Sequence, residues 1–367
     1  MPRVATGMKD PPVPTHRVLF GLAMAQGALS VLAWGFLGQP AMGGIAWHVH
    51  ELVFGQAIAV IGGYLLVRLP AWRLLALTAV WIGARLAPLI PFAPEELWAA
   101  LSIGATAAIA IPAAQAFLRG AKRLGNFVFP VLLSGFVIAD IAFYVGMLSA
   151  AAWLADLGLR LGLGLLVLLI AAMGGRLLSA AASGAAQWAG GARIPPQHGL
   201  ERAVLALIAV GFLANAADAE VVAAPVLLVV AGGLLTARIA RWSPGLRQSG
   251  GDVRALAVGQ AWLGLGLLTW CLVRMGLELP VASQSALHLA TIGGIGGTLL
   301  VMMMRTVAQR ERAPAPCRPA EVVAGLMAAA ALARAFGPPD WGWPMAAALW
   351  MAATLVAAIT TFTPRAP

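Results

Sequence analysis

Residues 126–148 read NFVFPVLLSGFVIADIAFYVGML and contain a single charged side chain, Asp140. About 20 apolar residues in a helix cross the hydrocarbon core of a bilayer, so this stretch predicts a transmembrane helix. The rest of the chain has the same character, because 61% of its 367 residues are hydrophobic and only 10% are charged. Soluble domains carry roughly a quarter charged residues. The sequence therefore predicts an all-α integral membrane protein, since helices satisfy their own backbone groups in lipid.

About twelve apolar segments of this kind follow one another along the chain. A window of about 19 residues places them near 17–38, 51–69, 72–91, 96–118, 126–148, 152–175, 200–217, 221–241, 254–275, 282–304, 320–336 and 342–363. The longest stretches between them, 176–199, 242–253 and 305–319, are too short for a soluble domain. We therefore interpret residues 1–367 as a single polytopic membrane domain.

The basic residues divide unevenly between the two sides that these spans define. Of the 24 Lys and Arg residues, all but Arg85, Arg160, Arg274 and Arg334 fall on the side of the N-terminus. Cytoplasmic loops of membrane proteins carry the excess of Lys and Arg, so we expect both termini in the cytoplasm. The formal charge of +10 then reflects topology. It gives no reason to expect a nucleic-acid partner.

Three of the five histidines lie at the outer ends of two predicted spans. Trp47-His48-Val49-His50-Glu51 opens the second span and Ser285-Ala286-Leu287-His288 begins the tenth. The topology therefore places His48, His50 and His288 in one leaflet. Imidazoles on two helices can ligate haem iron or copper. An interfacial histidine pair beside Trp47 in an aromatic belt is an equally good interpretation.

The spacing of His48 and His50 restricts how they can act together. Two residues apart on one helix, their side chains point about 200° apart and cannot both face one ion. Three alternatives follow: one of the two is the ligand, the helix begins after His48, or the two serve different centres.

Other polar residues of the spans lie at related depths. Arg85, Asp140 and Tyr144 fall in outer halves, where an isolated charge in lipid is costly. Arg85 is expected to pair with Asp140 or to bind an anionic group such as a haem propionate, and a purely structural ion pair is the alternative. The glycine-rich run 292–297 favours close approach of another helix or of a flat cofactor.

Two segments are similar to segments of the NnrS family. They are Trp47–Gly55, read WHVHELVFG, and Ser285–Gly297, read SALHLATIGGIGG, and weaker similarity runs in order through nearly the whole chain. The resemblance implies a bacterial inner-membrane protein that binds haem and copper and is linked to nitric oxide, nitrosative stress and denitrification. It carries over His48, His50 and His288 as metal ligands, with Trp47, Glu51, Arg85, Tyr144, Thr291 and Gly293 around the cofactor.

The chain also departs from the family pattern. A histidine that the family places near position 308 is missing, and Tyr144 stands where many members have a histidine. We therefore expect haem b rather than copper, with membrane lipids, haem and nitric oxide as partners. A secondary transporter of a small anion or metabolite, without a metal, is the alternative function, and an assembly subunit of a respiratory complex is a third. The reaction and the oligomeric state stay open.

Overall fold

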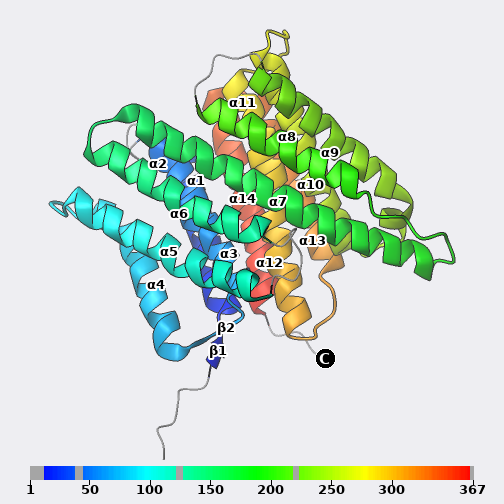
Figure 1. Ribbon diagram of the computed structural model, residues 1–367, viewed down its shortest axis with the longest axis horizontal. Helices are drawn as coiled ribbons and strands as arrows, with labels where there is room; N and C mark the ends of the chain where they lie inside the picture. The colour runs from blue at the N-terminus through cyan, green and yellow to red at the C-terminus, as the bar shows by residue number, and fades with distance from the viewer. Residues whose placement is uncertain (1–11, 38–43, 121–126, 218–222, 364–367) are drawn as a thin grey trace, which may run out of the picture.

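A computed structural model describes residues 12–37, 44–120, 127–217 and 223–363 of the chain. It is a bundle of long helices with one small two-stranded sheet (Figure 1). The first half comprises β1 (Pro12–Pro14), α1 (His16–Leu37), α2 (Gly44–His50), η2 (Glu51–Ala57), α3 (Ile58–Leu65), β2 (Arg68–Pro70), α4 (Ala71–Leu86), η3 (Ala87–Leu89), α5 (Glu95–Gly120), α6 (Val128–Leu148) and α7 (Ala152–Trp188). The second comprises α8 (His198–Ala216), α9 (Ala223–Gln248), α10 (Gly251–Arg274), α11 (Ser283–His288), η5 (Leu289–Gly296), α12 (Gly297–Arg310), α13 (Cys317–Phe336) and α14 (Pro339–Phe362).

Each of the twelve predicted spans coincides with helix in this structure. Eleven helical segments of the described chain are long and apolar enough to cross a membrane. The twelfth, α4, has 16 residues, or about 24 Å at 1.5 Å per residue. It stops there because Pro88, Pro91 and Pro94 follow in quick succession, and proline cannot continue a helix. The prediction of an all-α membrane protein with about twelve spans is confirmed.

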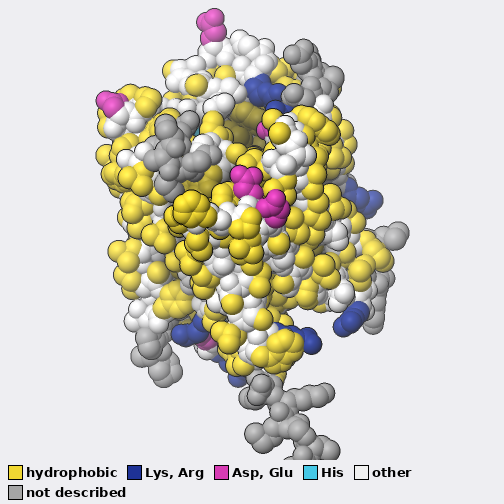
Figure 2. All heavy atoms as spheres, turned by 90° about the vertical axis from the view of Figure 1, so that its left-hand side faces the viewer, with side chains coloured by type: hydrophobic (Ala, Val, Ile, Leu, Met, Phe, Trp, Pro, Cys, Tyr) yellow, Lys and Arg dark blue, Asp and Glu magenta, His cyan; other side chains and the backbone are white. Residues whose placement is uncertain are grey.

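The two ends of the described chain lie at the same end of the bundle, drawn at the bottom of Figure 1. We call this the lower end. There β1 pairs with β2 in antiparallel register, with Val13 opposite Leu69, which fastens the segment before α1 to the segment after α3. Figure 2 shows one wall of the molecule covered mainly by hydrophobic side chains, with basic side chains at its lower edge. This is the surface expected of a protein embedded in lipid.

The second and tenth spans form the centre of the bundle. Their most apolar windows are 61% buried for Gly44–Leu65 and 72% buried for Ser283–Arg310, the two highest values among the eleven spans. The other helices surround them, and α1 packs against α14 to close the ring. The histidine-bearing spans are therefore the ones best shielded from lipid.

Both central spans change to a π-helical turn directly after a histidine. In one, η2 begins at Glu51, after His50, and in the other η5 begins at Leu289, after His288. Isolated π-helical turns are rare and occur frequently at functional sites, because the extra residue per turn redirects the side chains around it. These π-helical turns indicate a functional site in the parts of the two spans that carry His50 and His288.

Candidate functional site

His50 lies in a fully buried polar cluster between the second span, α5 and α6. Its Nε2 is 3.0 Å from Oδ1 of Asp140, and the side chains are 3% and 0% exposed. Thr106 donates a hydrogen bond of 2.7 Å to the other oxygen of Asp140, and Ser102 donates one of 3.3 Å. Because a carboxylate only accepts, this pairing places a proton on Nε2 of His50.

Glu51 forms the second half of the same cluster. Its Oε1 accepts a hydrogen bond of 2.8 Å from Nη1 of Arg85 and lies 3.5 Å from Nδ1 of His50. Arg85 also donates to Ser102 at 3.0 Å, and Gln26 donates to the free oxygen of Glu51. A Cβ at Gly55 would lie 2.9 Å from Nη1 of Arg85, so the glycine leaves the room that this guanidinium needs. The cluster thus pairs two carboxylates with one guanidinium and one imidazole, and leaves only Nε of Arg85 without a partner among its described atoms.

Aromatic rings close the cluster off. The ring of Phe143 stacks on the imidazole of His50 at 4.6 Å between centroids, and Tyr144 meets it edge-on at 5.2 Å. The ring of Phe54 is tilted by 33° to the imidazole, with 5.0 Å between their centroids. With these neighbours, both ring nitrogens of His50 face carboxylates and both faces are covered. A metal at Nε2 would have to displace Asp140.

His48 faces the opposite way, toward α1 and the second half of the chain. Its ring stacks on Trp34 at 4.4 Å, nearly parallel at 18°. Its Nδ1 is buried and has no hydrogen-bond partner in the described ranges. It lies close enough to His288 to act on it electrostatically, and Arg334 acts on both imidazoles. His48 therefore lies outside the cluster of His50, on the side of the second span that faces Trp34.

His288 is oriented by its own helix. Its Nδ1 lies 2.8 Å from the carbonyl oxygen of Gln284, one turn earlier. A carbonyl oxygen only accepts, so Nδ1 carries the proton and Nε2 presents a lone pair. Metal-bound histidines are oriented in this manner, by a hydrogen bond from the nitrogen that does not bind. The geometry of His288 fits a ligand role.

Arg334 supplies a positive charge beside this pair. Its Nη1 donates a hydrogen bond of 3.3 Å to Ser285, and its guanidinium lies 4.3 Å above the ring of Trp343. No carboxylate pairs with it within the part of the chain that the structure describes. A half-buried arginine without an acidic partner is suited to an anionic group of a ligand.

The structure thus divides the predicted site residues between two places. Glu51, Arg85 and Tyr144 gather around His50, while His48 and His288 lie together on the other side of the second span. The expectation that Arg85 pairs with Asp140 is wrong, because Arg85 pairs with Glu51 and Asp140 with His50. In the described residues no group of three or more His, Cys, Asp or Glu side chains could hold a metal ion.

The remaining predicted residues lie nearby without a specific polar contact. Trp47 and Thr291 are half-buried, on α2 and η5. Gly293 faces Trp262, since a Cβ there would come within 2.8 Å of the indole, and Gly294 is as close to the backbone of Leu263. The glycine run therefore accommodates helix α10. The close approach that the sequence predicts is made by a helix, and the indole fills the space beside Gly293.

Sequence reasoning missed several members of these clusters. Ser102 and Thr106 are four residues apart on α5, the spacing that places two polar side chains on one face of a helix. Gln26 and Trp34 come from α1, which carried no predicted site residue. Arg334 was visible as one of only four basic residues on the outer side, and that charge pattern could have identified it.

The chain matches one protein family over most of its length. The family model described as NnrS protein matches residues 14–364, which is nearly the whole chain. Neither a curated protein nor a solved structure matches the chain.

Proposed function

The chain belongs to the NnrS family, and this membership supports a role as a membrane protein of the nitric oxide response. We propose that it binds haem b between its second and tenth spans. His48 and His288 are the iron ligands in this proposal, and Arg334 meets a propionate. Haem iron supplies a centre that binds nitric oxide and exchanges electrons. The observation that carries the proposal is that Nδ1 of His48 is buried without a partner in the described structure, while the backbone hydrogen bond at Nδ1 of His288 leaves its Nε2 open.

The residues present fit such a group in three respects. The Nδ1 proton of His288 is held by a backbone carbonyl, which leaves Nε2 for a metal. The buried Nδ1 of His48 lacks the partner that a buried polar atom requires. Trp34 covers one face of that imidazole and fixes its plane. His50 fits less well, since its nitrogens face Asp140 and Glu51.

The experiment is the absorption spectrum of the purified protein, with haem quantified by pyridine haemochrome. We expect His48→Ala and His288→Ala each to lose the Soret band while remaining monodisperse on size-exclusion chromatography. His198→Ala is the matched control, because His198 is exposed at the start of α8. His50→Gln, which keeps a donor for Asp140, should retain haem. Loss of haem in His50→Gln together with retention in His48→Ala would overturn the assignment.

Copper is a separate part of the proposal. The family resemblance implies it, but the described residues offer no third imidazole with open nitrogens near His48 and His288. We therefore propose a single haem centre. Metal analysis tests this directly, and a stoichiometric copper in haem-loaded protein would contradict it.

The orientation in the membrane completes the proposal. We place both termini in the cytoplasm and the haem centre in the outer leaflet of a bacterial cytoplasmic membrane. The excess of Lys and Arg on one side and the common end of the two termini support this (Figure 1). A C-terminal green fluorescent protein should be fluorescent and a C-terminal alkaline phosphatase inactive. The reverse pattern would refute the orientation.

A further inference from the structure

A cavity lies in the lower half of the bundle, between α1, α3, α6, α7, α10 and α12. It is at the other end of the central spans from the histidines, since Met302 follows His288 by 14 residues, or roughly 20 Å of helix. The two central spans thus carry the histidines at one end and line this cavity at the other.

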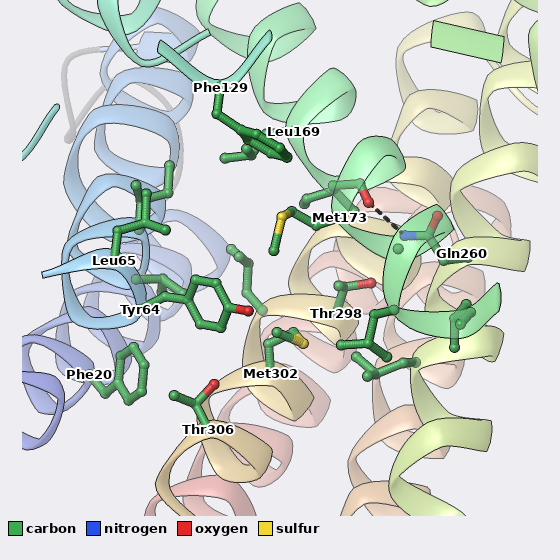
Figure 3. Close-up of a pocket in the computed structure, with 18 residues that line it drawn as sticks. Phe20, Tyr64, Leu65, Phe129, Leu169, Met173, Gln260, Thr298, Met302 and Thr306 are labelled. Carbon is green, nitrogen blue, oxygen red and sulfur yellow. Dashed lines mark hydrogen bonds between the residues drawn. The ribbon is translucent and has the colours of Figure 1, made fainter. Parts of the chain in front are cut away.

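The lining is almost entirely apolar and includes no charged side chain. Three aromatic rings, of Phe20, Tyr64 and Phe129, and two thioethers, of Met173 and Met302, stand around the space (Figure 3). Rings and thioethers pack favourably against a planar aromatic ligand. The charged head group of a phospholipid finds no counterpart there. The lining therefore suits an uncharged, lipid-soluble molecule.

Two hydroxyl groups are available to such a ligand. Figure 3 shows the hydroxyl of Tyr64 directed into the cavity and the hydroxyl of Thr306 at its lower side. Neither makes a hydrogen bond to another described residue. A hydroxyl in apolar surroundings is destabilising unless it is paired, so both favour a ligand with hydrogen-bond acceptors.

Of the other polar groups of the lining, Gln260 is hydrogen-bonded to other described residues and Thr298 is not. Gln260 accepts a hydrogen bond of 2.8 Å from the buried Arg238 and donates one of 3.2 Å to the carbonyl of Ile170. The hydroxyl of Thr298 lies against α10, since a Cβ at Gly259 would be 2.4 Å from it. Among the described residues, free hydroxyls of the lining are thus those of Tyr64, Thr306 and Thr298, of which Thr298 is buried against α10.

We propose that this cavity binds the ring of an isoprenoid quinone, with a ring carbonyl accepting a hydrogen bond from Tyr64 or Thr306. A quinone combines the planar ring, the acceptor oxygens and the apolar tail that the lining calls for, and it is dissolved in the membrane. The inference concerns binding alone. It does not rest on the haem proposal.

The experiment measures binding of decylubiquinone and menadione to the full-length protein in detergent, by quenching of tryptophan fluorescence. Saturable binding is expected. Tyr64→Phe, which removes only the hydroxyl, should weaken it by about tenfold, the effect of one hydrogen bond. Met302→Trp should abolish binding by filling the space. Thr354→Val is the matched control, because Thr354 is a buried threonine of α14 outside the cavity.

Three outcomes would overturn the proposal. The first is equal affinity in the wild type and in Tyr64→Phe and Met302→Trp variants that are folded by size-exclusion chromatography. The second is the absence of saturable quinone binding. The third is a lipid extract of the purified protein that contains phospholipid in stoichiometric amount and no quinone. The Soret band of the same samples reports on haem independently, so failure here leaves the haem proposal standing or falling on its own result.

Discussion

Nε2 of His50 lies 3.0 Å from Oδ1 of Asp140, although 90 residues separate them along the chain. Both side chains are buried, and each has further polar partners in Glu51, Ser102 and Thr106. This relationship joins the second span to α6 in the interior of the bundle. It also distinguishes His50 from His48 and His288, which have no carboxylate partner in the described structure.

Removing Asp140 should destabilise the protein strongly. Asp140→Ala removes the acceptor of the Nε2 proton of His50 and of the hydroxyl protons of Ser102 and Thr106, and breaking a buried pair costs about 3–5 kcal/mol. Asp140→Asn keeps an acceptor and should cost less. Thermal unfolding in detergent measures both. Asp156→Ala is the control, since Asp156 is half-exposed in its pair with Arg160, and exposed pairs contribute about 1 kcal/mol or less.

Glu51 and Arg85 should be energetically coupled. Each single variant, Glu51→Gln or Arg85→Met, leaves its partner buried and unpaired in a contact of 2.8 Å. The double variant removes both charges together. We expect its loss of unfolding free energy to be smaller than the sum of the single losses by about 2 kcal/mol. A double-mutant cycle of unfolding free energies checks this, and strict additivity would mean that the pair contributes nothing.

Gly266 should tolerate no side chain. A Cβ there would lie 2.2 Å from the backbone nitrogen of Ala290, where α10 packs against η5. Gly266→Ala must separate the two helices and should cost about 1–3 kcal/mol, as other overpacked cores do. Gly325→Ala is the opposite case, because nothing lies within 4 Å of its Cβ. That variant should unfold at the same temperature as the wild type or slightly above it.

The ion pair between Arg17 and Glu311 should make stability depend on pH. Arg17 donates two hydrogen bonds to the Glu311 carboxylate at the lower end of the bundle, and these hold the pKa of Glu311 below its ordinary value of 4.5. The folded state therefore binds this proton less readily than the unfolded state. The contribution is present above about pH 5 and is lost as the pH falls through the lowered pKa.

Unfolding temperatures from pH 6 to pH 3 test this. The wild type should lose more stability over that interval than Glu311→Gln, by a small amount because the pair is partly exposed. Glu96→Gln is the control, since Glu96 is exposed and makes no ion pair within the described residues. Parallel curves for the wild type and Glu311→Gln would contradict the prediction.

The sequence predicted the spans well because the signal is local. Each apolar run of about 20 residues forms a helix regardless of its neighbours, since lipid offers the backbone no other partners. The errors occur where local chemistry departs from that rule. The third span, helix α4, is shortened by Pro88, Pro91 and Pro94, and α7 continues to Trp188 through residues that the composition assigned to a loop.

The sequence also located the residues of the candidate site, without giving their partners. His48, His50 and His288 were found because histidine is rare in this chain, and Glu51 and Arg85 because charge is rare in its spans. Their pairing depends on how the helices rotate about their axes. A composition pattern carries no information on that rotation when most faces of a span are apolar.

By itself, the sequence determined the membrane location, the number of spans and the family, because hydropathy and short motifs are read along the chain. Only the tertiary structure decided that His50 pairs with Asp140 and that His48 stacks on Trp34. The physical reason is that two residues 90 positions apart meet through helix packing and the π-helical turns after His50 and His288. Those are long-range features, and no local window contains both partners.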